Sequence, residues 1–164
     1  MNLAARASRH INRVGREFFN KATGETLLGA PAEGRATYFH LDAEIEPGQV
    51  LHDPAELKNY IVADTDIIDG HLSVFAFHAL NSCNIVRPIG IKNDFGLNEY
   101  QPVTVAAAVP VIIAKSQQIV QVPVGTPVEI GDALLVGTVT YNVRSVSRSY
   151  DWPGIVNLMI TIIN

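Results

Sequence analysis

Near its C-terminal end the chain reads Val139-Thr-Tyr-Asn-Val-Arg-Ser-Val146 and, after a turn, Ile155-Val-Asn-Leu-Met-Ile-Thr-Ile-Ile163. In the first segment apolar and polar side chains alternate, which is typical of a strand with one buried face and one solvated face. The second segment carries apolar side chains on both faces: Val156, Leu158, Ile160 and Ile162 on one, and Ile155, Met159 and Ile163 on the other. Such a strand has to be covered twice, by its own core and by another layer or another subunit. We therefore expect a protein that works by assembly.

The composition points in the same direction. A chain of 164 residues suits one domain that buries roughly 70% of its unfolded surface, so it needs neither disulfide nor metal to fold. The apolar fraction is 48% and the charged fraction only 17%, below the usual ~25%, which favours surface hidden by partners. The single Cys83 forms no internal disulfide and favours a reducing compartment. The longest nearly apolar run, 103–114, is too short for a membrane helix, and we expect no membrane partner.

Most of the chain is predicted to be β-structure. Gly and Pro turn signals separate short apolar segments, and the candidate strands are 36–41, 60–63, 72–78, 84–87, 103–114, 118–122, 127–130 and 133–136, followed by the terminal pair. Asp53-Pro-Ala-Glu56 has the pattern of a helix start and predicts about two helical turns to Tyr60. We expect a mainly β fold, with a small β-barrel or sandwich as a β-rich body over 36–164.

The N-terminal segment predicts an amphipathic α-helix over 3–21, within a helical arm of residues 1–23 that is followed by a loop or hinge at 24–35. The apolar stripe of this helix is Leu3, Ala7, Ile11, Val14 and Phe18, and the basic stripe is Arg6, Arg9, Arg13 and Arg16. The basic stripe is compatible with a solvated face, an acidic protein partner, an anionic membrane, packaged nucleic acid or a mitochondrial presequence. The residues from Asp42 to Asp69 are strongly acidic, so a second copy of the chain is one such acidic partner.

Other groupings of polar residues have structural and functional interpretations. Asp64, Asp66 and Asp69, next to His71, form a solvated turn or a cation site, and the second option would suit a small metal-dependent enzyme. The other histidines and Cys83 lack the spacing of zinc ligands. The Gly-rich rhythm of 122–136 resembles a lipoyl or biotinyl carrier domain but has no lysine at a hairpin tip, so we expect an ordinary meander. We expect no catalytic residue, cofactor or metal, and hence no enzyme.

The C-terminal third resembles a family of known proteins. Val122-Pro-Val-Gly-Thr-Pro-Val-Glu-Ile-Gly-Asp132, then 139–146, then Asp151-Trp-Pro-Gly-Ile-Val-Asn-Leu-Met-Ile160 is similar to the small β-barrel head-tail joining and head-completion proteins of tailed bacteriophages. The similarity covers residues 120–163 and rests on structural motifs. The resemblance implies a ring-forming virion protein, and it assigns no catalytic residue to any position of this chain.

The two-sided strand and the composition favour an assembly protein, and the resemblance implies that it is a ring-forming head-tail connector in the virion, assembled in the host cytoplasm. Its partners would be copies of itself, portal and tail proteins, and packaged DNA as a further option. The expected interface residues are Leu3, Arg6, Arg9, Ile11, Arg13, Val14, Arg16, Phe18, Tyr150, Trp152, Ile155, Met159 and Ile163. A phage tail component, a capsid decoration protein and a membrane-surface protein anchored by the first helix are the alternatives, besides the metal-dependent enzyme.

Overall fold

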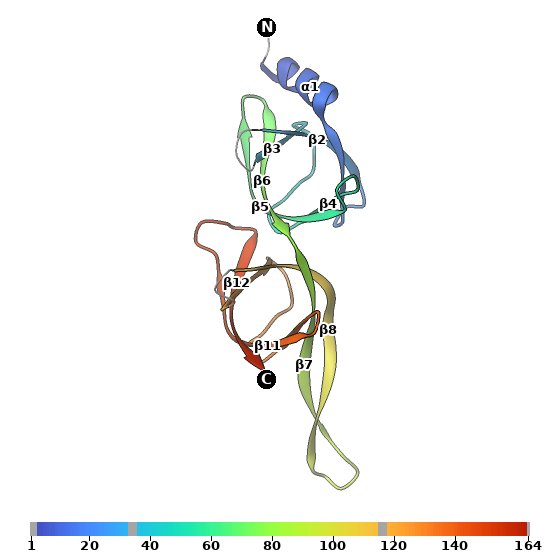
Figure 1. Ribbon diagram of the computed structural model, residues 1–164, viewed down its shortest axis with the longest axis vertical. Coiled ribbons are helices and arrows are strands. Elements are labelled where there is room, and N and C mark those ends of the chain that lie inside the picture. The colour runs from blue at the N-terminus through green and yellow to red at the C-terminus, as the bar shows by residue number, and fades with distance from the viewer. Residues whose placement is uncertain (1–2, 33–35, 115–117, 164) are drawn as a thin grey trace.

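The computed structural model of the chain describes residues 3–32, 36–114 and 118–163, and it is mainly β. Within these ranges one helix, α1 (Leu3–Val14), precedes twelve strands, which close into two barrels. The barrels follow one another along the long axis of the molecule (Figure 1). The helix α1 lies at one end of this axis, and the hairpin of strands β7 and β8 projects at the other end.

The N-terminal barrel is an antiparallel sheet closed in the order β1-β2-β3-β6-β5-β4. Its strands are β1 (Arg16–Asn20), β2 (Thr26–Pro31), β3 (Ala36–Phe39), β4 (Val50–Asp53), β5 (Lys58–Ile68) and β6 (His71–Ala79). Phe18 and Phe39 meet edge to face in its core, with ring centroids 5.6 Å apart, a favourable arrangement for two aromatic rings. Leu51, Val62 and Val74 fill the space around them.

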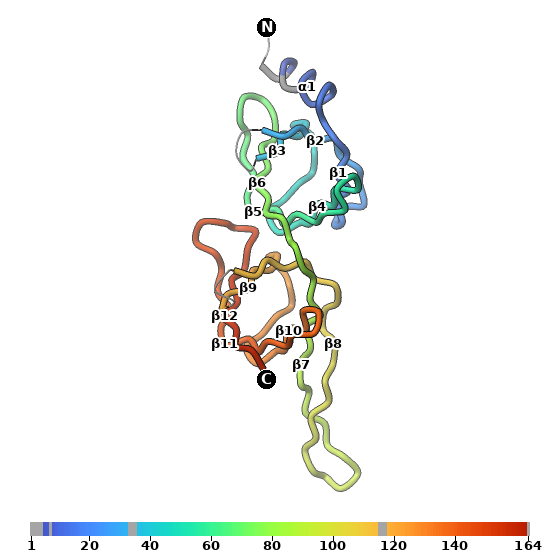
Figure 2. Tube along the Cα trace, in the orientation of Figure 1, coloured from blue at the N-terminus to red at the C-terminus, as the bar shows by residue number. Residues whose placement is uncertain are grey.

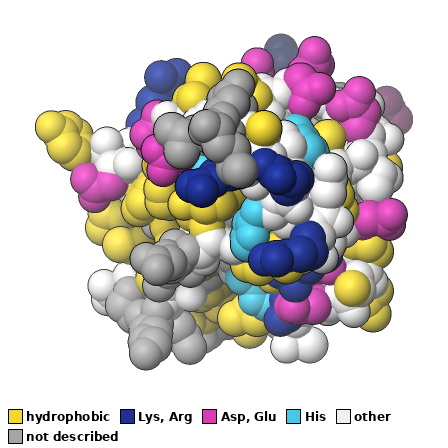
Figure 3. All heavy atoms as spheres, turned by 90° about the horizontal axis from the view of Figure 1, so that it is seen from above, with side chains coloured by type: hydrophobic (Ala, Val, Ile, Leu, Met, Phe, Trp, Pro, Cys, Tyr) yellow, Lys and Arg dark blue, Asp and Glu magenta, His cyan; other side chains and the backbone are white. Residues whose placement is uncertain are grey.

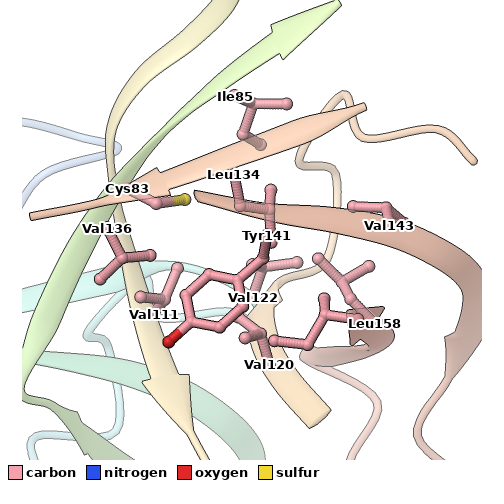
Figure 4. Packing of buried hydrophobic residues seen from close by; sticks show 11 residues of the cluster. Cys83, Ile85, Val111, Val120, Val122, Leu134, Val136, Tyr141, Val143 and Leu158 are labelled. Carbon is pink, nitrogen blue, oxygen red and sulfur yellow. The ribbon is translucent and has the colours of Figure 1, made fainter. Parts of the chain in front are cut away.

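The C-terminal barrel closes in the order β10-β11-β12-β9-β8-β7. Its strands are β7 (Asn81–Lys92), β8 (Asn98–Ile113), β9 (Ile119–Pro123), β10 (Ala133–Val136), β11 (Val139–Arg148) and β12 (Ile155–Ile163). Tyr141, Val143 and Leu158 point into a core that Figure 4 shows from close by. The predicted alternation is therefore confirmed at Tyr141 and Val143, whereas Val139, expected on the same buried face, is exposed. The predicted fold class is confirmed.

A buried contact joins the two barrels. Only Leu80 separates β6 from β7, and the loop before β12 returns to the N-terminal barrel. There the backbone N–H of Gly154 donates a hydrogen bond to the carbonyl oxygen of Ala63 (2.8 Å). Ile155, fully buried, packs with Ile61 and Ala63. The barrels therefore share a small apolar core between them.

The N-terminal segment differs from the prediction. The helix ends at Val14, and residues 16–20 form β1 instead of continuing the helix to residue 21. Phe18 suits both periods, but Phe18 and Asn20 are buried while Glu17 and Phe19 are exposed, which is the alternation of a strand. The expected hinge at 24–35 contains β2. The first barrel therefore takes two strands from before residue 36, and the predicted single body is two barrels.

Two further segments differ from the prediction. Residues 53–56 form a turn rather than a helix: the Asp53 carboxylate accepts hydrogen bonds from the N–H groups of Ala55 and Glu56 (3.0 and 3.1 Å), as a helix cap would. Leu57 then has φ 54°, a left-handed conformation that breaks a helix and leads directly into β5. Residues 127–130 form a loop and not a strand.

Candidate assembly surfaces

The most prominent surface feature is the distal part of the β7–β8 hairpin, residues 88–102, which we call the arm. Its strands pair in register from Pro88 with Pro102 to Lys92 with Asn98. Figures 1 and 2 show this hairpin extending beyond the C-terminal barrel, away from α1. From its base to its tip the arm is roughly 25 Å long, at ~3.3 Å per strand residue. It therefore reaches well past the body of its own chain.

The tip of the arm is held by its own hydrogen bonds. The Asn93 side-chain oxygen accepts from the N–H groups of Phe95 (3.0 Å) and Leu97 (2.9 Å), and its amide donates to the Glu99 carboxylate (2.7 Å). Gly96, with φ +74°, donates its N–H to the Asn93 carbonyl. These bonds define the turn that presents the Phe95 side chain, which is 88% exposed.

The arm carries more exposed apolar surface than its own strands can cover. Its exposed large apolar side chains are Ile89, Ile91, Phe95, Leu97 and Tyr100, with Val103 just beyond its base. In the register Ile89 and Ile91 lie on one face of the ribbon, and Tyr100, opposite Gly90, lies on the other. A two-stranded ribbon is marginally stable by itself in water, and exposed apolar side chains on both of its faces favour burial against another molecule. The arm therefore has the chemical character of a docking element.

An ion-pair network fixes the base of the arm. Arg87 on β7 donates two hydrogen bonds to the buried Asp132 carboxylate (2.8 and 2.9 Å) and one each to Glu129 and the Pro127 carbonyl. Burial alone would raise the pKa of Asp132, but hydrogen bonds from Arg87 and the Glu129 N–H hold that pKa below its ordinary value. This bidentate geometry is the strong form of such a pair. It ties the arm to the 127–132 loop of the barrel.

A second apolar surface lies on the outside of the C-terminal barrel. Met159 is 57% and Ile163 49% exposed, and Ile162 and Leu135 are exposed near them on β12 and β10. In the sheet register Leu135 lies opposite Thr140, which lies opposite Ile163, so these residues form one outward row. We call Leu135, Met159 and Ile163 the β12 face. Ile162 lies on the other side of the strand, opposite the buried Tyr141. The expectation that Ile155 belongs to it was wrong, because Ile155 is buried between the barrels.

Two residues of the predicted apolar stripe, Ile11 and Phe18, are covered within the chain. Ile11 is buried, since α1 packs on β2 and β6, and Phe18 lies in the barrel core. The expectation that these two residues contact a neighbouring subunit was therefore wrong. Val14 is exposed, and the Leu3 side chain lies outside the described part of the structure.

The four arginines of the predicted basic stripe separate into two groups. Arg6, Arg9 and Arg13 remain on α1 and, with His10, line a surface hollow of about 470 Å³. Arg16 instead lies on β1, forms ion pairs with Asp53 (3.1 Å) and Glu56, and places its guanidinium 5.2 Å from the centre of the Phe18 ring. Arg16 is therefore part of the barrel and not of the helix surface, which corrects the prediction. Hydrogen bonds from Lys58 and Arg16 lower the pKa of Glu56.

The two aromatic residues of the 149–154 turn have different surroundings. Tyr150 is fully exposed, as expected of an interface residue. Trp152 is half-buried, with its ring edge-on to Phe77 at 5.1 Å between centroids. The expectation that Trp152 anchors a neighbouring molecule was wrong, because its ring packs between the two barrels of its own chain.

The acidic residues Asp64, Asp66 and Asp69 do not form a cluster, because two of them lie on strand β5 and the third lies in the turn that follows. The Asp64 and Asp66 carboxylates on β5 accept hydrogen bonds from the N–H groups of the residues that follow them (2.8 and 2.7 Å), while Asp69 lies in the turn before β6. Among the described residues, no three His, Cys, Asp or Glu side chains gather in a way that could hold a metal ion. The structure therefore does not bring this set together with His71 as a cation site.

The histidines and the cysteine have individual structural surroundings. His71 is buried and its ring lies against Tyr38, with centroids 3.8 Å apart. His40 and His52 pair with Asn12 and Asn59, and His78 lies against Tyr60. Burial raises the pKa of the Cys83 thiol to about 11, which keeps it protonated and unreactive near neutral pH.

The projecting hairpin of residues 88–102, the arm, was not predicted from the sequence. Pro88 and Pro102 argue against a strand, yet they lie opposite each other in the exposed ribbon. The alternation of Ile89 and Ile91 before the Asn93-Asp-Phe-Gly96 turn was the available signal for a hairpin.

Neither the comparisons with known proteins nor the helix content assigns a function, so the surfaces described above are the guide to function. In the described part of the chain, the only helix is much shorter than a bilayer-spanning one, and no helix meets the length and hydropathy that a membrane span needs. The chain matches no protein-family model, and neither a curated protein nor a solved structure shows significant similarity to it.

Proposed function

We propose that this protein is a structural virion component that forms a ring at the head-tail junction of a tailed bacteriophage. The observation that carries the proposal is the arm, which extends beyond the C-terminal barrel (Figure 1) and carries the exposed side chains of Phe95, Leu97 and Tyr100. Our reason for proposing a position between portal and tail is that the sequence motifs of residues 120–163 resemble those of head-tail joining and head-completion proteins. Localisation in the virion follows from the same proposal.

In the proposed ring, the arm of each subunit lies on the β12 face of the next. Both surfaces are apolar, so their contact removes hydrophobic area from water. The free energy gained by this burial is about 25 cal/mol for each Å² of apolar surface. The charges also fit, because Asp94 and Glu99 lie on the arm, while Arg144 and Arg148 are exposed on β11 beside the β12 face. A contact between two different surfaces of identical chains is heterologous, and it closes into a ring when the rotation per subunit allows.

The experiment is a mass measurement of the purified full chain with negative-stain electron microscopy. We expect rings from the wild type, and only species of one or two chains from a Phe95→Ser, Leu97→Ser, Tyr100→Ser variant. A control is Leu57→Ser, which changes a leucine on the N-terminal barrel that is even more exposed than Leu97 and should leave the rings intact. Rings that survive loss of the arm side chains would contradict the proposed contact.

The position in the particle needs a separate measurement. Cross-linking of intact virions, followed by peptide mass spectrometry, should join this chain to portal and tail proteins. Cross-links confined to the capsid surface would instead identify a decoration protein, and cross-links confined to isolated tails would identify a tail component.

A further inference from the structure

The direction of the arm is set at the point where its strands leave the C-terminal barrel. We propose that Arg87 is a positioning residue there: it holds the arm at a fixed angle to the β12 face and thereby sets the number of subunits in the ring. We call the bonds of Arg87 to Asp132, Glu129 and Pro127 the clasp. This role rests on the proposed ring contact and names the group that controls its geometry.

The ribbon leaves the sheet of the barrel at Arg87. Strand β7 pairs with β10 as far as Val86, and Arg87 is the next residue. On the other side, β8 pairs with β9 at Ile112 and Ile113. Between these points and the tip, β7 and β8 have only each other as paired strands in the described part of the chain. A two-stranded ribbon twists more than a wider sheet, so backbone pairing alone leaves its direction loosely set.

The strands are irregular just before the clasp. The register of β7 against β8 shifts between Cys83 and Ile85 and again between Ile85 and Val86. Such bulges bend a strand and increase its twist. Within β8, Ala108 has φ 52°, and its N–H donates a hydrogen bond to the side-chain oxygen of Asn84 (3.0 Å). The ribbon is therefore bent at this level, and the clasp lies next to the bend.

The clasp holds the bent ribbon against the 127–132 loop. Nε and Nη2 of Arg87 donate to the two carboxylate oxygens of Asp132 (2.8 and 2.9 Å), and Nη2 also donates to the Pro127 carbonyl (3.1 Å). The Asp132 side chain is buried and also accepts from the Glu129 N–H (2.8 Å). A planar guanidinium bound through two parallel bonds has a defined orientation. These bonds therefore restrict rotation of β7 at the base of the arm.

The same loop connects the arm to the sheet that carries the β12 face. The Gly131 N–H donates to the carbonyl of Val143 on β11, and the Val143 N–H donates to the carbonyl of Asp132, both at 2.9 Å. Val143 lies opposite Ile160 of β12. In a heterologous ring, the angle between the two contact surfaces of each chain sets the rotation per subunit. Because the clasp fixes this angle, it controls how many subunits close the ring.

The direction of the arm can be measured in a single chain. Spin labels are placed at Asp94→Cys in the arm and Ser147→Cys on β11, both exposed, in the full chain with the three arm substitutions, so that no ring forms. Cys83 is buried and stays unlabelled. Pulsed electron paramagnetic resonance should give one narrow distance distribution, and Arg87→Ala should broaden it and shift its mean. The variant Arg87→Met, Asp132→Asn removes the clasp without leaving a buried charge unpaired, and it should have the same effect.

The N-terminal barrel supplies the matched control. Arg16 also pairs with a buried carboxylate, that of Asp53 (3.1 Å), but on the barrel next to α1. Figure 3 looks onto this end of the molecule, where Lys and Arg side chains lie next to Asp and Glu side chains, and Figure 1 shows that it lies opposite the arm. Arg16→Ala should leave the label distances unchanged. Glu129→Ala, which removes the exposed partner of the clasp, should have little effect. Circular dichroism should show that all variants keep the fold.

Mass measurement of the same variants with the arm side chains intact completes the test. The wild type and Arg16→Ala should form rings of one subunit number, and both clasp variants should form rings of mixed size or unclosed assemblies. The inference is overturned if the clasp variants keep the label distances, if Arg16→Ala changes them equally, or if the clasp variants form wild-type rings or no assembly. Each of these outcomes leaves the proposed ring standing. A wild type without rings would contradict the proposed function, and this inference with it.

Discussion

Trp152 in the C-terminal half packs edge-on against Phe77 of the N-terminal barrel, with ring centroids 5.1 Å apart and planes at 85°. Next to this contact, the N–H of Gly154 bonds to Ala63 and the Ile155 side chain is sealed between the barrels. The 149–154 turn therefore fixes the position of one barrel against the other. As a result, the arm at one end of the molecule and the basic surface of α1 at the other end have a defined relative position.

Replacing Trp152 with alanine should weaken the coupling of the barrels. We expect the free energy of unfolding to fall by about 3 kcal/mol, from lost apolar burial and the lost aromatic pair. Urea unfolding followed by circular dichroism should change from one transition to two as the barrels unfold separately. Tyr150→Ala, which changes a fully exposed neighbour, should have little effect. One unchanged transition in Trp152→Ala would show that the ring contributes no coupling.

Gly154→Ala tests the close approach of the two backbones. A Cβ at this position would lie 2.1 Å from the Val62 carbonyl oxygen and 2.5 Å from the Gly48 nitrogen, so the barrels would have to move apart. We expect a loss of at least about 2 kcal/mol in thermal or urea unfolding. Gly90→Ala is the matched control, because a Cβ there would meet the Tyr100 ring at 3.7 Å, an ordinary contact. Equal effects of the two substitutions would contradict the packing described here.

The Arg87–Asp132 pair gives the C-terminal barrel a pH dependence. Because the folded-state pKa of Asp132 is lowered, the pair stabilises the fold fully above the ordinary carboxyl pKa of about 3.9. This stability is lost as the pH falls below that value toward the lowered pKa. Asp132→Asn should remove this part of the pH dependence and lower stability at pH 7. Unfolding free energies of both proteins between pH 7 and 3 provide the check, and parallel curves would contradict it.

His71 is a buried polar residue whose replacement should not harm the fold. Neither ring nitrogen has a hydrogen-bond partner among the described residues, and an unsatisfied buried polar group costs about 1–3 kcal/mol. We expect His71→Phe to keep the contact with Tyr38 and to raise the free energy of unfolding by about 1 kcal/mol. His52→Phe, which breaks the hydrogen bond to Asn59, should lower it. A large destabilisation by His71→Phe would show that the imidazole has a polar role.

The local β-structure of this chain was predictable from sequence, while its division into two barrels was not. Alternation identified β11, because Tyr141 and Val143 are buried side chains next to polar neighbours. Phe18 misled, because it fits a helical stripe as well as a strand, and only pairing of β1 with β2 and β4 decides between them. Barrel closure depends on such distant pairings, which local patterns do not encode.

The candidate surfaces were predictable to a similar degree. Exposure of Met159 and Ile163 follows from their place opposite the buried face of β12. Burial of Ile155 and Trp152 depends on the presence of a second barrel, which the local sequence pattern does not predict. Arg16 lies on the same helical stripe as Arg13 in the sequence, but the strand that begins at Arg16 directs it toward Asp53.

A photo-cross-linking amino acid at position 95 tests the central claim, that the arm is covered by another copy of the chain. Phe95 is the exposed residue at the arm tip, so a cross-linker in its place should react with whatever covers it. We expect covalently joined dimers whose linked peptides come from the β12 face, with residues Met159 to Ile163, of a second copy. A chain that remains monomeric under illumination, or that links only within itself, would contradict the account.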